Sequence, residues 1–310
     1  MPPDEYPAHS CPVCEGHTWQ PLHRKNGFRY FRCTSCRLEI TWPLPTEAQI
    51  ADYYKSQTEK ASYAVRVNYP REDSVHRKIA EWGISLNGGK APQTILDVGC
   101  LDGRLLDIFK EKGATTYGIE IQSDAAAIAG KKHDGRISNG TIEQFAEKNE
   151  GQRFDVVTAI GVIEHVPDPV SFLKTIRRLI SSDGLLVLQT PNTSSSLHSI
   201  MGSHWPPYVP IEHIYLFSAR NLAMLLDKCG FEMTECKNHW KWLQIEFFYL
   251  MTELFMPFAY KLLRPIVPRL PEAVKTMSVP LYSGEMLATA NPVSGYKRTL
   301  DSKGKYWLYT

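Results

Sequence analysis

The stretch Thr94-Ile-Leu-Asp-Val-Gly-Cys-Leu-Asp-Gly103 decides the fold of this 310-residue chain. Its short apolar run is interrupted by Asp97 and ends at two glycines, and a helix-forming stretch, residues 104–112, follows at once. This pattern predicts a buried strand, a tight turn and the N-terminus of a helix. In a Rossmann-like sheet, such a junction receives a nucleotide-derived ligand.

An acidic residue follows at the spacing that such a site uses. Glu120 ends the next strand-like run about twenty residues after the turn, where these folds bind ribose hydroxyls with a carboxylate. The turn reads G-x-x-x-G, because Leu101 stands where a dinucleotide site has its second glycine. The leucine side chain would crowd a diphosphate, and no Gly-Lys-Ser/Thr follows for a P-loop. An adenosine-type ligand without phosphates fits this pattern better.

The turn resembles the first motif of the class I S-adenosylmethionine-dependent methyltransferases, Asp-Val-Gly-Cys-Gly-x-Gly, with Leu101 as the departure. The resemblance implies S-adenosylmethionine as cofactor, with Glu120 on the ribose and the segment after the third strand near the adenine. A glycine turn without a ligand is the competing interpretation. The cofactor-binding residues that the resemblance implies are Asp97, Gly99, Cys100, Gly103, Glu120, Ile121, Thr141, Ile142 and Gly161.

Composition narrows the class of protein. Hydrophobic residues make up 43% of the chain, which is ordinary for a globular protein with a sizeable core. The net charge of +2 gives no indication of a nucleic-acid surface. Seven cysteines, together with an N-terminus that lacks a basic region and an apolar run, predict a reducing compartment and a cytoplasmic location.

Two Cys-x-x-Cys pairs near the N-terminus predict a metal site. Cys11 and Cys14 are separated from Cys33 and Cys36 by eighteen residues, and four thiolates at this spacing form a closed tetrahedral zinc site. Such a site has no open coordination position, so the zinc is expected to be structural. A redox pair, unliganded thiols, or replacement of one ligand by a nearby histidine are the alternatives.

A helical region is expected between the zinc segment and the glycine turn. Thr46 and Gln49 predict a capping box at the start of one helix, and residues 71–86 predict a second. Tyr53, Tyr54 and Tyr63 either cover the cofactor or are half-buried packing residues. The expected organisation is 1–45 zinc ribbon, 46–90 helical linker and cofactor cover, 91–239 Rossmann-like core, 240–283 apolar helical insertion and 284–310 closing strands.

From residue 94 the chain alternates between strand and helix patterns. This alternation predicts an α/β fold with a parallel sheet and helices on both faces. The resemblance implies that this is a Rossmann-like class I methyltransferase sheet, and the cysteine pairs add a small N-terminal zinc ribbon. Ligands in such sheets bind at the carboxyl ends of the strands. Strands are expected at 94–98, 115–120, 135–138, 154–160, 185–190 and 231–236, and helices at 103–113, 123–131, 141–149, 169–181 and 218–229.

Two pairs of titratable residues fall at these strand ends. Glu164 and His165 follow the strand at 154–160 in Glu-His-Val-Pro-Asp-Pro, where the resemblance to methyltransferases is closest. Glu212 and His213 belong to a Pro-x-Glu-His-x-x-x-Phe-Ser pattern seen in methyltransferases of small metabolites and sugars. Either histidine could accept a proton from an acceptor hydroxyl or amine at neutral pH. The alternatives are that these residues anchor loops or position the cofactor.

The segment 240–263 is apolar enough to raise the question of a membrane. A spanning helix would bury Glu246 and Glu253 and contain Pro257, each of which is costly in a bilayer. An insertion packed on the core is therefore favoured. A surface-bound helix, or a pocket for an acyl or prenyl substrate, stays open.

The sequence is thus expected to encode a methyltransferase that uses S-adenosylmethionine and contains structural zinc. The expected acceptor is a small molecule, with a sugar, nucleotide-sugar or lipid-linked glycan intermediate as candidates. One alternative is a tRNA or rRNA methyltransferase that uses the zinc ribbon to bind RNA, which the near-neutral charge disfavours. Another is a non-catalytic binding protein with a degenerate Rossmann domain. The sequence gives no indication of oligomeric state.

Overall fold

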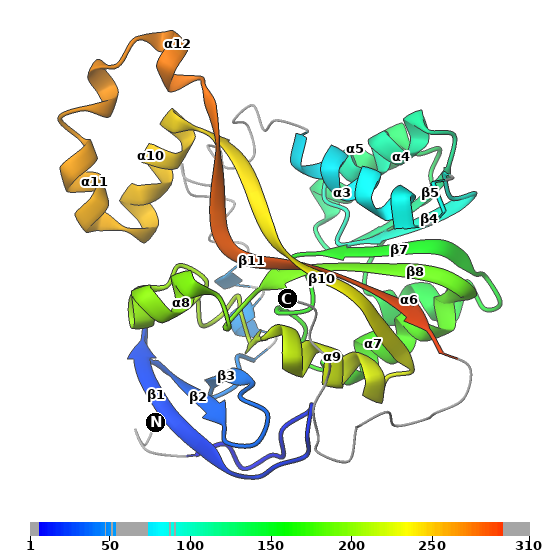
Figure 1. Ribbon diagram of the computed structural model, residues 1–310. Helices are drawn as coiled ribbons and strands as arrows, with labels where there is room; N and C mark the ends of the chain where they lie inside the picture. The colour runs from blue at the N-terminus through cyan, green and yellow to red at the C-terminus, as the bar shows by residue number, and fades with distance from the viewer. Residues whose placement is uncertain are drawn as a thin grey trace.

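The computed structural model describes residues 6–46, 48–50, 52–53, 74–86, 88–89 and 91–293. Tyr54, Tyr63, the first residues of the expected helix at 71–86 and the end of the expected closing strands, 294–310, lie outside the described residues. Two sheets organise the described part of the chain, a central one of seven strands and a smaller one near the N-terminus (Figure 1).

The central sheet has the strand order β10-β11-β8-β7-β4-β5-β6. Its five strands from β6 to β8 are parallel, whereas β11 and β10 run antiparallel at one edge. The parallel strands are rich in buried apolar residues, as expected for a sheet covered on both faces. The strands are β4 Thr94–Val98, β5 Thr115–Glu120, β6 Ile137–Asn139, β7 Phe154–Ile160, β8 Ile180–Pro191, β10 Phe231–Gln244 and β11 Ser278–Pro292.

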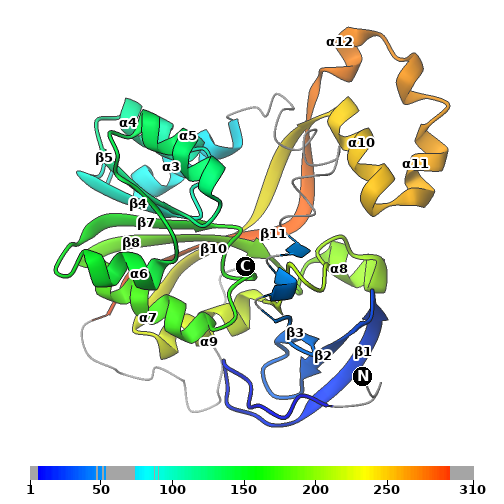
Figure 2. The ribbon, with the colours of Figure 1, turned by 180° about the vertical axis from the view of Figure 1, so that it is seen from behind.

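Helices cover both faces of this sheet, so the predicted α/β architecture is confirmed. In Figure 1, α3, α4 and α5 lie on one face and α6, α7 and α9 on the other, and Figure 2 shows the same division from behind. Ser218 caps α9 through its hydroxyl, as its sequence position predicts. The helices are α3 Ser74–Leu86, α4 Arg104–Glu111, α5 Ser123–Lys132, α6 Ile142–Lys148, α7 Pro169–Leu179 and α9 Ala219–Lys228.

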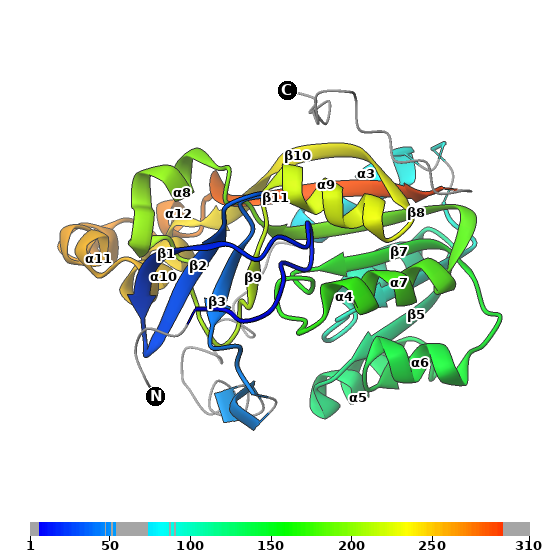
Figure 3. The ribbon, with the colours of Figure 1, turned by 90° about the horizontal axis from the view of Figure 1, so that it is seen from below.

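The N-terminal sheet is shared between the ribbon and the core. Strands β1 Trp19–Lys25, β2 Phe28–Cys33 and β3 Glu39–Trp42 form an antiparallel meander. Strand β9, Tyr215–Leu216, comes from the core and pairs with β3, as Figure 3 shows from below. The short helices α8 Ser196–Met201 and η1 Gly202–His204 lie in the segment that leads to β9. The ribbon is therefore joined to the core by main-chain hydrogen bonds, which the sequence pattern did not indicate.

The predicted capping box after the ribbon is present. Thr46 donates its main-chain N–H to the Gln49 side chain, and the Thr46 hydroxyl accepts from the Gln49 N–H. This reciprocal pair supports the expected helix start at residue 46.

The insertion between α9 and the C-terminus differs from its predicted bounds. Strand β10 continues to Gln244 and β11 begins at Ser278, so 240–244 and 278–283 are strand rather than helix, and 240–244 pairs with 278–282. Aromatic residues such as those in 240–242 favour an extended strand once a partner strand is present. No local sequence pattern predicts the partner, which is why the sequence analysis expects a helix here. The helical part consists of α10 Ile245–Phe255, α11 Pro257–Leu263, η2 Val267–Arg269 and α12 Glu272–Lys275.

These helices lie at the far end of the long strand pair β10–β11, away from the helices that cover the sheet (Figures 1 and 2). We call α10, α11, η2 and α12 the arm. Among the described helices, none combines the length and apolarity needed to cross a bilayer.

Two other strand predictions were too short or displaced. Strand β8 begins at Ile180 rather than 185, because Ile180 already pairs with Phe154 of β7, and the polar stretch 181–184, which resembles a turn, forms an irregularity before pairing resumes at Leu185. Strand β6 occupies 137–139 instead of 135–138. The helices predicted in the core end within about two residues of their observed bounds, which is the usual ambiguity of helix termini.

Candidate active site

The glycine turn after β4 has the conformation that its sequence predicts. Gly99, Leu101 and Gly103 all have positive φ, at +77°, +48° and +83°. The Gly99 N–H donates to the Ile119 carbonyl at the end of β5, and the Gly103 N–H donates back to the Cys100 carbonyl. Leu101 is 46% exposed, so its side chain is not packed into the core beneath the turn. The main-chain groups of the turn lie at the carboxyl edge of the sheet.

Glu120 fixes this turn against the neighbouring strand. Its buried carboxylate accepts hydrogen bonds from the N–H groups of Leu101, at 2.9 Å, and Gln122, at 2.8 Å. A carboxylate offers about four lone-pair positions, so acceptor capacity remains for two ligand hydroxyls. The residue therefore stands where the sequence analysis places a ribose-binding acid.

Asp97 lies beneath the turn in the interior of the sheet. The Thr158 hydroxyl donates to its carboxylate at 2.6 Å, and complete burial raises the pKa of Asp97 to about 7. This position makes Asp97 a support for the turn rather than a group facing a ligand. The partner on β7 could not be found from the sequence, since cross-strand contacts depend on strand order.

Close packing explains two residues of the motif. A Cβ on Gly103 would lie 2.7 Å from His133 Nε2, and a Cβ on Gly118 would lie 2.7 Å from the Cys100 sulfur. Cys100 is itself buried. These residues set the path of the turn between β4, β5 and α5.

The residues predicted near the adenine occupy different environments. Asn139 donates its amide to the carbonyls of Glu120 and Ile121, which ties the end of β6 to the end of β5. Ile121 is 59% exposed, Thr141 forms a capping box with Gln144, and Ile142 is buried in the core. The segment lies at the expected strand ends, but the Thr141 hydroxyl and the Ile142 side chain serve helix α6.

The loop after β7 packs directly on the glycine turn. Gly161, at φ +68°, donates its N–H to the Gln189 carbonyl, and a Cβ on Gly99 would lie 2.7 Å from Val162 Cγ2. The acid–histidine pair that follows Val162 is therefore held beside the cofactor-binding turn.

Glu164, His165 and His213 form one cluster. One ligand-type atom from each residue lies within 4.8 Å of the others, and His165 Nε2 is 3.8 Å from Glu164 Oε1. The two imidazole rings meet edge to face with their centroids 4.9 Å apart. The structure thus brings together three of the four predicted acid–base residues from two separate segments.

Backbone carbonyls set the tautomers of both histidines. His165 Nδ1 lies 2.7 Å from the Glu212 carbonyl, and His213 Nδ1 lies 2.6 Å from the Pro207 carbonyl. Because a carbonyl only accepts, each Nδ1 carries the hydrogen and each Nε2 carries the lone pair. His165 Nε2 lies 3.8 Å from Glu164 Oε1, and the Nε2 of each histidine is the nitrogen that can accept a proton or coordinate a cation.

Burial controls the charges of the pair after β7. It lowers the pKa of His165, whose ring is therefore neutral near pH 7, and it raises the pKa of Glu164. The Thr190 hydroxyl at the end of β8 donates to Glu164 Oε2 at 3.0 Å. The sequence places Thr190 at a strand end in Gln189-Thr190-Pro191-Asn192, but it does not reveal the bond to Glu164, since nothing local pairs the two residues.

Glu212, the fourth predicted acid–base residue, has a different role from the three residues of the cluster. The Glu212 carboxylate accepts a hydrogen bond from the Tyr53 hydroxyl at 2.9 Å, and its main-chain carbonyl orients His165. Tyr53 from the helical linker thereby contacts the loop that carries His213.

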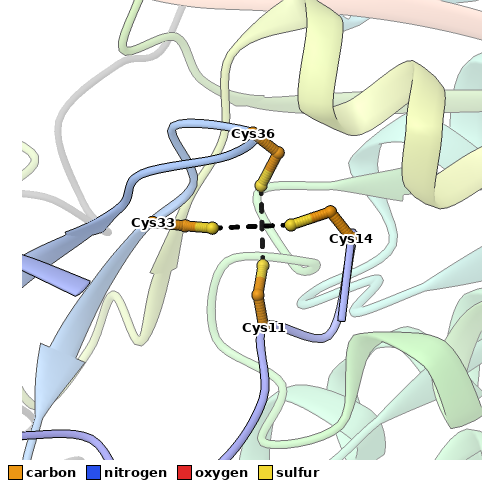
Figure 4. A group of neighbouring side chains, drawn as sticks. All are labelled: Cys11, Cys14, Cys33 and Cys36. Atoms are coloured by element: carbon orange, nitrogen blue, oxygen red, sulfur yellow. Dashed lines mark hydrogen bonds between the residues drawn. The ribbon is translucent and has the colours of Figure 1, made fainter. Parts of the chain in front are cut away.

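The four cysteines of the ribbon converge on one point, as Figure 4 shows. The Sγ atoms of Cys11 and Cys36 are 3.5 Å apart and those of Cys14 and Cys33 are 3.4 Å apart. Tetrahedral thiolates about 2.3 Å from a zinc ion would be about 3.8 Å apart, whereas a disulfide is about 2.05 Å long. The donor set and its spacing fit a four-thiolate zinc site.

The ribbon reaches the candidate site through β3. The buried Thr41 hydroxyl donates to the His213 carbonyl at 2.9 Å, and the Thr41 N–H donates to the Ile214 carbonyl. The Ile214 N–H in turn donates to the Glu164 carbonyl at 2.8 Å. The position of His213 relative to Glu164 therefore depends on the ribbon.

Comparisons with known proteins agree with this architecture. A family model described as a methyltransferase domain matches residues 71–236, more than half of the 310 residues. Two relatives named ubiquinone biosynthesis O-methyltransferase come from Pseudomonas paraeruginosa and Nitrosomonas europaea. The first is 35% identical over 132 residues, covering 39% of this chain and 55% of the relative, and the second is 34% identical over 126 residues, covering 38% and 53%. The chain thus spans about half the length of these curated relatives.

A solved structure shows the same fold at low identity. The 1,6-didemethyltoxoflavin-N1-methyltransferase of Burkholderia thailandensis, solved with 1,6-didemethyltoxoflavin and S-adenosylhomocysteine, superposes with a TM-score of 0.51. The identity is 15%, over 89% of this chain and 100% of that one.

Proposed function

Because this chain belongs to the methyltransferase-domain family, we propose that it transfers a methyl group from S-adenosylmethionine to a small molecule. The observation that carries the proposal is the turn at 99–103, whose main chain is anchored by Glu120 at the edge of the sheet. Leu101 stands where a dinucleotide-binding turn has its second glycine, and this favours an adenosyl group over a diphosphate.

The proposed cofactor site uses the residues around the turn. Glu120 would accept from the ribose hydroxyls, and the main chain at Gly99, Cys100 and Gly161 would line the methionine side. Ile121 is exposed at the strand end where an adenine ring would stack. Asp97 supports the turn from inside the sheet.

The proposed reaction is an in-line displacement at the sulfonium methyl. The acceptor's electron pair forms the new bond to carbon while the C–S bond breaks and its pair moves to sulfur, which leaves S-adenosylhomocysteine. The sulfonium is already activated, so positioning the two partners supplies most of the catalysis. Where the acceptor is a hydroxyl, the Nε2 of His165 or His213 would accept its proton.

We propose an oxygen acceptor on a small molecule, with sugars, nucleotide-sugars and glycan intermediates as the first candidates. The O-methyltransferase relatives support oxygen as the acceptor atom, and the Pro-x-Glu-His-x-x-x-Phe-Ser segment around His213 suggests a sugar. The test measures transfer of labelled methyl from S-adenosylmethionine to a panel of sugar nucleotides, phenols and tRNA. Labelling of tRNA alone would contradict the proposal.

We propose that the ribbon holds one structural zinc ion through its four cysteines. All seven cysteines of the chain are free thiols, which fits metal ligation and a reducing, cytoplasmic location. Elemental analysis is expected to give one zinc per chain fewer in Cys33→Ser than in the wild type.

The arm is proposed to contact a lipid surface or a lipid-linked acceptor. Phe258 is 77% exposed, and Leu262 and Ile266 are 58% and 56% exposed, with Lys261 and Arg264 between them in the chain. Apolar side chains interleaved with cations suit an anionic membrane interface. Sedimentation with phosphatidylserine vesicles is expected to retain the protein, and Phe258→Ser with Leu262→Ser to release it; equal binding of both proteins would contradict the proposal.

A further inference from the structure

We propose that Glu164, His165 and His213 bind one divalent transition-metal ion, which receives the oxygen of the acceptor. The inference rests on the proposed methyl transfer for its chemistry but not for its geometry. It replaces proton acceptance by a histidine with metal coordination by the same Nε2 atoms.

The three side chains have the separations of a metal site. Ligands about 2.0–2.2 Å from an ion lie roughly 2.9–4.4 Å apart. The ligand atoms of the three residues are all within 4.8 Å of one another, and His165 Nε2 is 3.8 Å from Glu164 Oε1. A closure of a few tenths of an ångström would complete the coordination.

Each ligand is oriented by a partner on its other polar atom. The Nδ1–H groups of His165 and His213 donate to main-chain carbonyls, which makes Nε2 the ligating nitrogen of each ring, and His165 Nε2 lies 3.8 Å from Glu164 Oε1. The Thr190 hydroxyl occupies Glu164 Oε2 and leaves Oε1 toward His165. Hydrogen bonds of this kind characterise the surroundings of metal-ligating histidines and carboxylates.

The donor set indicates the class of ion and its role. Two imidazoles and one carboxylate suit Fe²⁺, Mn²⁺, Co²⁺ or Zn²⁺ and leave coordination positions open. This distinguishes the cluster from the ribbon, whose four thiolates close the coordination shell. An open position beside the glycine turn can take an acceptor hydroxyl.

Metal binding would explain how the acceptor is activated. Coordination lowers the pKa of a bound hydroxyl, whose proton leaves to solvent water. The oxygen then forms its bond to the methyl carbon while the C–S pair returns to sulfur. The ion also orients the oxygen in line with the sulfonium, which favours acceptors with an ionisable oxygen.

The test measures metal binding directly in the full chain with its ribbon zinc retained. Mn²⁺ prefers oxygen and nitrogen to thiolate, so its paramagnetic resonance signal reports this cluster and not the ribbon. We expect one bound Mn²⁺ per chain. His213→Gln and Glu164→Gln should each weaken it at least about tenfold, the lower bound for disturbing a metal site.

His204→Gln is the matched control, because His204 is an exposed histidine of the same segment outside the cluster. It should bind Mn²⁺ like the wild type, and thermal melts identify any variant that fails to fold. Absence of Mn²⁺ and Zn²⁺ binding beyond the ribbon ion, or unchanged binding in both ligand variants, would overturn the inference.

Calorimetry with S-adenosylmethionine separates this inference from the proposed function. Cofactor binding without a second metal would refute the metal site and leave methyl transfer intact. Binding of a second metal ion without binding of S-adenosylmethionine would refute methyl transfer and leave the metal site intact.

Discussion

Replacing Gly103 by alanine should lower the free energy of unfolding by an amount that can be estimated from the structure, and it should weaken binding of the cofactor. Gly103 has φ +83°, and an L-residue in this conformation costs about 1–2 kcal/mol. The new Cβ would lie 2.7 Å from His133 Nε2 and 3.3 Å from the Ala129 Cβ. Overpacking of this kind costs a further ~1–3 kcal/mol.

His133 cannot move aside without losing other contacts. It is fully buried, its Nδ1 bonds the Thr116 hydroxyl at 2.9 Å and its Nε2 lies 3.2 Å from the Asp107 carboxylate. The expected loss of unfolding free energy in Gly103→Ala is therefore about 2–5 kcal/mol.

Gly113→Ala is the matched control for this prediction. Gly113 has φ +89°, but nothing lies within 4 Å of the position that a Cβ would take there, so only the conformational cost of about 1–2 kcal/mol applies. Urea unfolding measures both variants, and calorimetry measures their affinity for S-adenosylmethionine. Equal destabilisation and equal affinity in the two variants would refute the steric argument and the role given to the turn.

Three further predictions concern the ribbon and the buried carboxyl. Thr41→Val removes the hydroxyl that donates to the His213 carbonyl, so it should lower the free energy of unfolding in urea by about 1–3 kcal/mol and reduce kcat. Thr34→Val, which loses an exposed hydroxyl, should change neither. Unchanged stability and kcat in Thr41→Val would contradict the link between ribbon and site. Removing the ribbon metal with a strong chelator should lower turnover along with ribbon structure, because β3 holds His213, and full turnover after zinc loss would refute this coupling. Burial raises the pKa of Asp97 to about 7, from a value near 4 in the unfolded chain. The stability that the protonated Asp97 gives the folded state is therefore complete below about pH 4 and is lost as the pH rises to about 7, which lowers the free energy of unfolding by up to about 4 kcal/mol. The side chain introduced by Asp97→Asn is neutral at every pH. The stability of this variant relative to the wild type, measured by urea unfolding, should therefore be greater at pH 8 than at pH 5. The same difference at both pH values would contradict the prediction.

The sequence predicts the core because its signals there are local. The apolar run before Gly99 and the caps at Thr46 and Ser218 are each determined by neighbours within a few residues. Glu120 is recognised by its fixed spacing of about twenty residues after the turn. Strand β10 shows the opposite case. Its residues 240–244 are apolar enough for a helix, and only pairing with β11 about forty residues later makes them a strand.

The candidate site divides in the same way. The acid–histidine motifs could be found from their positions after strands, but the meeting of His213 with Glu164 depends on strand β9 joining the ribbon sheet. The roles of Thr158 and Thr190 could not be predicted, because each bonds a carboxylate on another strand or loop. Such contacts require the strand order, which no spacing along the chain supplies.

The central claim is that the turn at Gly99 and Glu120 binds an adenosyl sulfonium. Calorimetric titration of the zinc-containing protein with S-adenosylmethionine tests it most directly. We expect one cofactor per chain, with affinity lost in Glu120→Ala and no binding of NADH. Absence of S-adenosylmethionine binding to the folded wild type, or binding of NADH at this turn, would contradict the account.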